Sequence, residues 1–65
     1  MQTAERLLLR PEQGADALGM SRAAFYKLLS SGAVPSITIG RSRRIPVASL
    51  EAWVARQLAE QVPGG

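Results

Sequence analysis

Three residues between two short helical segments constrain this chain more than any other feature. Gly19, Met20 and Ser21 interrupt the helical pattern. Gly19 tolerates the left-handed conformation in which helices commonly end. The Ser21 hydroxyl can accept a hydrogen bond from an unpaired N–H one turn into a following helix. The pattern therefore predicts two short helices joined by a tight turn.

The segment before this turn is expected to form a helix over about Pro11 to Leu18. Proline suits the first helical turn, because its missing N–H would have no partner there. Ala15 and Leu18 form an apolar side, to which Ala17 can add. Gly14 weakens this helix, because glycine is a poor helix former.

The segment after the turn is expected to form a second helix over about Ser21 to Ser30, which ends at Gly32. Met20 precedes the cap and is expected to pack across the turn onto Phe25 as a hydrophobic staple. Four apolar residues share one face of this helix, at spacings i, i+1, i+4 and i+5: Ala24, Phe25, Leu28 and Leu29.

After the second helix the apolar period changes from 3.6 to 2, which predicts a β-hairpin. We expect Ile37 to face Ile45 across an antiparallel pair and Ile39 to face Arg43, with residues 40–42 as a three-residue loop. This register points Ile37 and Ile45 towards the core. A hairpin this short must pack against a helix to be stable.

The same register places Arg44 on the opposite face beside Thr38 and leaves Arg41 at the tip. A two-residue turn that begins at Gly40 is the alternative, and it shifts these directions by one position.

A third helix is expected to begin near Val47, after Pro46. Its apolar stripe is predicted to serve the core: Leu50, Trp53, Val54 and Leu58. Trp53 is either a core anchor or a hot spot for a protein partner, and its spacing within the stripe favours the core.

With 65 residues, 46% of them hydrophobic and 20% charged, the chain is expected to form one globular domain over residues 1–65. Its core spans about residues 7–60, and residues 61–65 form a frayed tail. The absence of Cys and His excludes disulfides, the usual zinc ligand sets, cysteine nucleophiles and histidine general bases. No segment resembles a signal peptide or a membrane span, so a cytoplasmic protein is expected. We predict no enzyme activity, catalytic residue, metal or cofactor.

The positive charge is concentrated in the middle of the chain. Residues 17–50 carry five Lys and Arg residues and no acid, whereas the segments on either side each have a net charge of −1. Uncompensated charge in one segment indicates a polyanionic partner, or it serves only as a solvated basic face. Charge by itself does not separate the two.

The predicted order is short strand, helix, turn, helix, hairpin, helix: a mainly α fold with a small β-hairpin, in which a helix-turn-helix is followed by a basic wing. This chain resembles the excisionase-type, MerR-like winged helix-turn-helix DNA-binding domains over about Leu7 to Val54. Five stretches carry the resemblance: Leu8–Arg22, Phe25–Leu29, Gly32–Pro35, Ile39–Pro46 and Leu50–Trp53. Gly14 departs from the family, which more often has a helix former there.

The resemblance implies two groups of DNA-binding residues. The second helix of a helix-turn-helix lies in the major groove. Its residues outside the core include Ser30 and the five candidates for DNA contact: Ser21, Arg22, Ala23, Tyr26 and Lys27. The wing, which family members lay along the minor groove or its phosphates, contributes Arg41, Ser42, Arg43 and Arg44.

Several of these roles have alternatives. Arg22 contacts a guanine edge or a phosphate. Tyr26 contacts DNA or is a half-buried ring that shields the core. Arg43 or Arg44 either contacts DNA or pairs with a carboxylate such as that of Glu51.

By resemblance, the expected function is that of an excisionase, a recombination directionality factor of a phage or mobile element. Such proteins bind and bend attachment-site DNA and promote excision by a tyrosine integrase. The implied partners are double-stranded DNA and the integrase, with cooperative self-association on DNA by a protein that is monomeric in solution. No small-molecule effector is expected, because the sequence does not continue into the long dimerisation helix and effector domain of MerR-type regulators. The alternatives are a small transcriptional regulator and a protein-interaction module that docks an acidic partner on its basic face.

Overall fold

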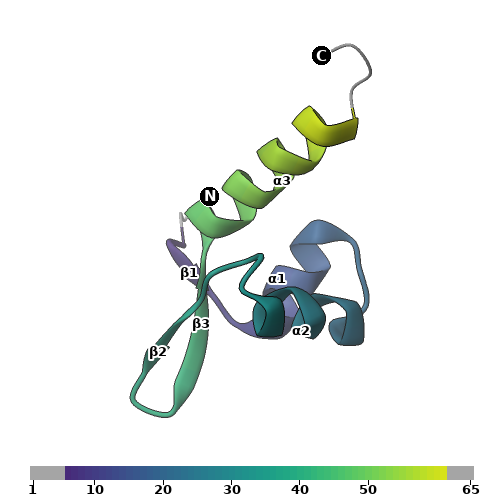
Figure 1. Ribbon diagram of the computed structural model, residues 1–65. Helices are drawn as coiled ribbons and strands as arrows, with labels where there is room; N and C mark the ends of the chain where they lie inside the picture. Colours follow the sequence, from purple (N-terminus) through teal and green to yellow (C-terminus); the bar gives the residue numbers. More distant parts are fainter. Residues whose placement is uncertain (1–5, 62–65) are drawn as a thin grey trace.

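The computed structural model describes residues 6–61. The expected order of elements is confirmed (Figure 1): β1 (Leu8–Leu9), α1 (Pro11–Leu18), α2 (Arg22–Ser31), β2 (Ile37–Ile39), β3 (Ser42–Pro46) and α3 (Val47–Gln61). Gln61 belongs to α3, and the rest of the predicted tail lies outside the described residues. No helix within residues 6–61 is long and apolar enough to cross a membrane.

The three strands form one antiparallel sheet in the order β1-β3-β2. β1 pairs with β3 through Leu8 opposite Pro46 and Leu9 opposite Ile45. The Val47 N–H also donates to the Leu7 carbonyl at 2.9 Å, which ties β1 to the start of α3. The sequence predicted the strand but not this pairing. Because β1 adds a third strand to the hairpin, the sheet is more stable than an isolated hairpin would be.

Every element except β1 and β2 contributes a side chain to the small core. The buried apolar residues are Ala15, Phe25, Leu29, Val34, Ile45 and Leu50. Leu9, Leu18, Met20, Leu28 and Trp53 are partly buried and pack around them. The core roles predicted for Met20 and Trp53 are thus confirmed. Ala24 is exposed, contrary to the prediction, because it lies at the margin of the apolar face of α2.

The tight turn between α1 and α2 is closed by local hydrogen bonds. The Met20 N–H donates to the Ala15 carbonyl at 3.0 Å. The Ser21 Oγ accepts from the Ala24 N–H at 3.1 Å, as predicted for a capping residue. These bonds pair backbone groups that would otherwise be left without partners at the two helix ends.

Gly14 has a packing role that the sequence did not reveal. A Cβ atom added at this position would lie 2.7 Å from Cζ of Phe25, whose side chain is fully buried. The Phe25 ring therefore packs directly on the bare backbone of α1. The weak helix former is present because α1 and α2 approach too closely there for a side chain, and α1 is nevertheless a regular helix over its predicted span.

The hairpin register is that of the alternative, a two-residue turn that begins at Gly40, and the expected three-residue loop is wrong. Ile37 faces Arg44, Thr38 faces Arg43 and Ile39 faces Ser42. The turn contains two residues, and Gly40 adopts a φ of 62° at its first position. Two-residue turns match the twist of the flanking strands, and glycine at the first position is typical of type II′.

This shorter turn reverses the faces of β2. Thr38 shares a face with Arg43 and with the buried Ile45, whereas both isoleucines of β2 lie on the opposite face of the sheet. The expected inward direction of Ile37 is therefore wrong, and only Ile45 of the predicted pair reaches the core.

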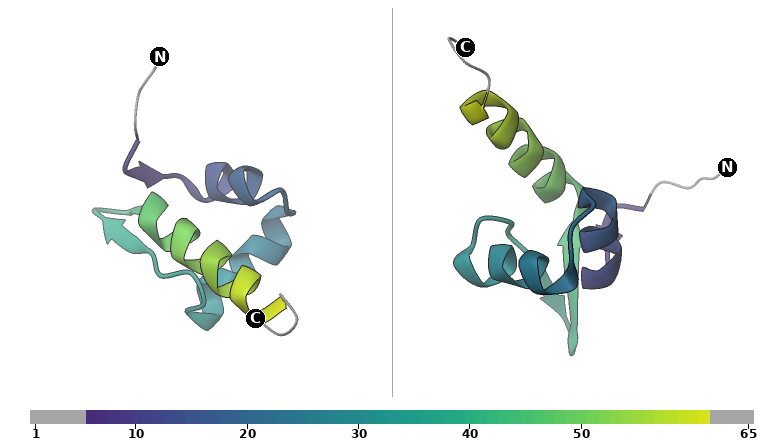
Figure 2. Two further views of the ribbon diagram at one scale, coloured as in Figure 1. Left: turned by 90° about the horizontal axis from the view of Figure 1, so that it is seen from above. Right: turned by 90° about the vertical axis from the view of Figure 1, so that its right-hand side faces the viewer.

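The apolar stripe of α3 is only partly used by the core. Leu50 is buried and Trp53 half-buried, but Val54 and Leu58 are 47% and 64% exposed. Figures 1 and 2 show the reason: α3 leaves the end of β3 and projects away from α1 and α2, so that only its first turns lie against the body. The prediction that the core needs the whole stripe is wrong.

We predict that Gly14→Ala destabilises the fold although alanine is the better helix former. The close contact with Phe25 should cost ~1–3 kcal/mol through overpacking, against a propensity gain of at most ~1 kcal/mol. Urea unfolding of the variant and its parent measures the difference. In a double variant with Phe25→Leu the penalty should shrink, and a single variant at least as stable as the parent would contradict the packing role.

Candidate nucleic-acid interface

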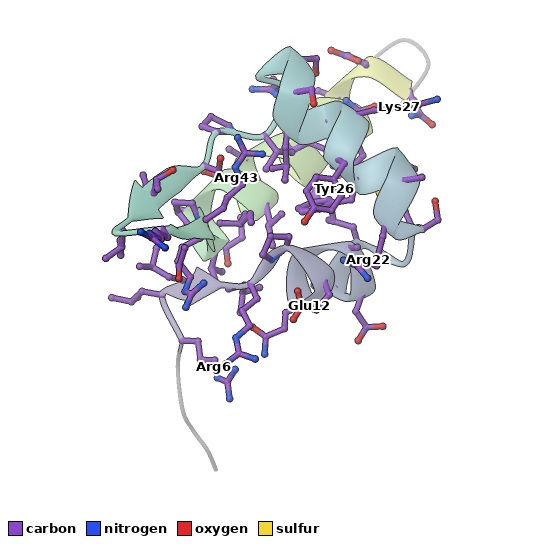
Figure 3. All side chains as sticks on the ribbon, turned by 90° about the horizontal axis from the view of Figure 1, so that it is seen from below. Arg6, Glu12, Arg22, Tyr26, Lys27 and Arg43 are labelled. Carbon is purple, nitrogen blue, oxygen red and sulfur yellow. The ribbon has the colours of Figure 1, made fainter. Side chains whose placement is uncertain are left out.

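All five residues predicted for the recognition helix are exposed. Ser21 caps α2 and Arg22 lies in its first turn, while Ala23, Tyr26 and Lys27 lie off the face that Phe25 and Leu29 bury in the core. Figure 3 shows Arg22, Tyr26 and Lys27 following one another along this helix. Tyr26 is 38% exposed, so its ring covers part of the core edge while part of its surface meets solvent.

The four predicted wing residues lie at and just after the hairpin turn. Arg41 is in the turn and exposed, as expected. Arg43 is exposed on the sheet face that Ile45 shares, and Figure 3 shows it on the same side of the molecule as Tyr26. Ser42 and Arg44 are half-buried and belong to the opposite face. The wing arginines therefore do not form a single row: the register divides them between two faces and the tip.

Arg44 is held by the main chain. Its Nη1 donates to the carbonyl of Arg43 at 3.1 Å. The sequence had instead allowed an ion pair between Arg43 or Arg44 and a carboxylate. The guanidinium keeps its charge and its other N–H groups, because this bond uses one donor only.

Acidic residues lie closer to the recognition helix than the linear charge pattern suggests. Glu12 and Asp16 of α1 line the same shallow hollow as Ser21 and Arg22. Glu12 is on the same side of the molecule as Arg22 in Figure 3. Arg22 thus stands at the boundary between the basic face and an acidic patch on α1. A polyanion is attracted towards α2 and the hairpin and repelled from α1.

Arg56 of α3 has a structural role that the sequence analysis did not identify. Its Nη2 donates to the carbonyl of Ala33 at 2.8 Å. Ala33 belongs to the junction that joins α2 to β2, between Gly32 at the helix end and the fully buried Val34. The bond therefore ties α3 to the segment that sets the hairpin relative to the recognition helix. No local sequence signal marks the bond between Arg56 and Ala33, because the two residues are 23 positions apart.

Further contacts hold this junction from the helix side. The Val34 N–H donates to the Leu28 carbonyl at 3.2 Å, and the Ala33 N–H donates to Ser31 Oγ at 3.3 Å. Short loops with satisfied backbone groups keep a defined geometry. The spacing between α2 and the hairpin is therefore set by the fold.

The side chains on this side of the molecule are chiefly hydrogen-bond donors. Guanidinium, ammonium and hydroxyl groups bind phosphate oxygens and the acceptor atoms of base edges. Within residues 6–61, no group of three His, Cys, Asp or Glu side chains comes together in a way that could hold a metal ion. The chemistry of this surface suits a polyanionic ligand.

The chain belongs to the helix-turn-helix domain family, which it matches over residues 8–58. This is a family of DNA-binding domains and not of enzymes. The chain is also similar to a protein of Saccharopolyspora erythraea described as a probable excisionase, with 43% identity over 56 residues. That match covers 86% of this chain and 57% of the relative's length, so the chain spans a little over half of the relative. The resemblance to excisionases is thereby confirmed, while no solved structure gives a significant match.

We predict that Arg56→Ala lowers the free energy of unfolding by about 1 kcal/mol, because a charged hydrogen bond at an exposed site is lost. Arg56→Lys should lose less, since an ammonium can still donate to the carbonyl. Glu60→Ala, on an exposed position of the same helix, is the matched control and should change stability by less than about 0.5 kcal/mol. Equal effects in the two alanine variants, measured by urea unfolding, would show that the bond to Ala33 contributes nothing.

Proposed function

We propose that this protein is an excisionase that binds attachment-site DNA, with α2 in the major groove and the hairpin along the adjacent minor groove or its phosphates. The observation that carries the proposal is the grouping of donors on one side of the molecule: Arg22, Tyr26 and Lys27 of α2 with Arg43 of the hairpin. The similarity to a probable excisionase supports the choice among DNA-binding roles.

Within the proposed complex, Arg22 is the principal reader of sequence. It lies in the first turn of α2, and the N-terminal residues of a recognition helix contact base edges. An arginine there can bond O6 and N7 of a guanine with two parallel hydrogen bonds. Tyr26 and Lys27, one turn further along, contact bases or backbone.

The Ser21 hydroxyl is proposed to hold a phosphate. Its oxygen already accepts from the Ala24 N–H, which leaves the hydroxyl hydrogen free to donate. The N-terminus of α2 adds a favourable dipole at the same place. Such contacts fix the register of the protein on the duplex, but they carry no sequence information.

The proposed role is architectural. The protein bends DNA at the attachment site, and a tyrosine integrase carries out strand cleavage and joining, so no catalytic group is needed in this chain. A recombination assay with the integrase and attachment sites of one element tests this role: excision should rise and integration fall when the protein is added. Binding without any effect on either reaction would favour a transcriptional regulator that uses the same surface.

Cooperative binding is proposed because a single module of this size contacts only about 600–1,000 Å² of DNA. Several copies on adjacent sites multiply weak contacts through their effective concentration. The exposed Val54 and Leu58 are too small a pair to hold a dimer in solution, since stable interfaces bury about 800 Å² on each partner.

We predict that Arg22→Ala weakens binding to the cognate site by ~1–3 kcal/mol more than binding to random duplex, because a base-edge contact is lost. Fluorescence anisotropy titrations on both duplexes measure the difference. Glu60→Ala, on an exposed position of α3, should leave the discrimination unchanged. An equal loss on both duplexes would reduce Arg22 to a phosphate contact.

Replacing Arg41, Arg43 and Arg44 together by Ala should weaken binding to every sequence while preserving part of the specificity, because α2 still reads the groove. The parent, with about three to five phosphate contacts, should show a slope of log affinity against log salt of about −3 to −4.5. The triple variant should have a flatter slope and an unchanged circular dichroism spectrum. A folded variant with undiminished affinity would exclude the hairpin from the interface, and a parent without salt dependence would favour a protein-interaction module.

We expect the free protein to sediment as a monomer and to bind tandem sites with higher affinity per site than a single site. Analytical ultracentrifugation followed by titration onto duplexes with one, two and three sites checks both statements. A stable dimer without DNA, or equal affinity per site on all three duplexes, would rule out assembly on the DNA.

A further inference from the structure

Two large apolar side chains project from the hairpin into solvent. Ile37 is 44% exposed and Ile39 55% exposed, and both lie on the sheet face opposite the buried Ile45. The usual strand at the surface of a small domain turns apolar residues inward and polar residues outward. β2 does not follow this pattern: all three of its residues are exposed, and both isoleucines lie on the face away from Ile45.

An exposed apolar pair at this place indicates a contact surface. A threonine is β-branched and suits a strand as well as isoleucine does, without presenting an apolar surface to water. Neighbouring exposed apolar residues commonly mark binding surfaces. The pair is separated by only one or three residues from Arg41 at the tip, and Ile37 faces Arg44 across the strands.

The charge around the isoleucines identifies the partner. Arg44 faces Ile37 on the same side of the sheet and Arg41 lies next to the pair in the turn, while residues 17–50 contain no acid. A surface that combines arginines with apolar side chains suits the minor groove of DNA, where guanidinium groups follow the negative potential and apolar residues such as Ile contact or wedge the groove. The deoxyribose walls of that groove are themselves apolar.

We propose that Ile37 and Ile39 are DNA-contacting residues that pack against the minor groove and help to open it. Residues rise about 3.4 Å each along a strand, so Ile37 lies about 7 Å farther from the turn than Ile39. The minor groove is about 7.5 Å deep. A hairpin that enters tip first therefore places Ile39 near the floor of the groove and Ile37 near its rim.

The same dimensions connect these residues to bending. Two paired strands lie about 4.8 Å apart before side chains are added, whereas the undeformed minor groove is about 6 Å wide. The groove must widen to admit the hairpin, and a widened minor groove accompanies a bend towards the major groove. Burial of the two isoleucines contributes free energy that offsets this deformation. The inference rests on the proposed function and adds the residues that bend the DNA.

The test is a double variant, Ile37→Thr with Ile39→Thr, on a 30-bp duplex that carries one site selected by the parent protein from a random pool. The duplex ends carry a donor and an acceptor dye, so that energy transfer reports the bend. We expect about tenfold weaker binding and a smaller bend, because apolar burial is lost. The salt slope should match that of the parent, because no cation is removed. The matched control is Val54→Gln with Leu58→Gln, which removes two exposed apolar side chains from α3, and it should alter neither quantity.

The other possible results of this experiment also test the role of Ile37 and Ile39. A folded double variant with the affinity and bend of the parent overturns the inference. Unchanged single-site binding with a loss of cooperativity on a two-site duplex also overturns it, and assigns the isoleucines to a contact with a second copy. If thermal melting shows that the double variant is unfolded, Ile39→Thr alone, next to the turn, should still reduce the bend. If the parent protein binds no duplex, the proposed function itself is rejected. If the parent binds and the double variant binds and bends DNA equally well, only the role of the isoleucines is rejected.

Discussion

The contact between the Phe25 ring and the backbone of Gly14 underlies the arrangement of the whole domain. The ring is fully buried and lies where a side chain on α1 would otherwise be. This close approach fixes how α2 lies on α1, and it therefore determines which face of α2 remains exposed. In a chain with six buried apolar residues among those described, one such contact is a large share of the core.

A second constraint comes from β3, the central strand of the sheet. Ile45 is fully buried, and the strict alternation of a strand then sends Arg44 to the opposite face. β1 holds the end of this strand, and α3 begins immediately after it. The tip of the hairpin is thus an extension of a well-anchored strand, which gives its exposed residues a defined direction relative to α2.

Together these two constraints place α2 and a basic hairpin on one support. In the loop between them the N–H groups of Gly32, Ala33 and Val34 are bonded, and Arg56 ties the loop to α3. Such a fixed arrangement lowers the entropy that is lost when the two elements bind a partner together. The acidic residues of α1 beside Arg22 limit the attractive surface to the side that α2 and the hairpin share.

Local signals in the sequence were sufficient for the elements, and together with charge they named the candidate site residues. Pro11, Gly19 and Ser21 mark helix ends through their own backbone and capping preferences, and the period-2 pattern marks the hairpin. Charge along the chain and the excisionase resemblance pointed to α2 and the wing, and the exposure of Ser21, Arg22, Ala23, Tyr26 and Lys27 agrees with that prediction.

Tertiary structure decided what depends on contacts between distant residues. The hairpin register changed by one position because turn length and twist, rather than apolar pattern, chose the pairing, and this turned Ile37 outward. The necessity of Gly14 appears only when Phe25 is packed against it, and the bond from Arg56 to Ala33 joins residues far apart in sequence. Exposure of Val54 and Leu58 likewise depends on the direction in which α3 leaves the sheet. A sequence records which residues prefer a helix, a strand or a turn; which of them meet is a property of the folded chain, since packing selects among local conformations of nearly equal free energy.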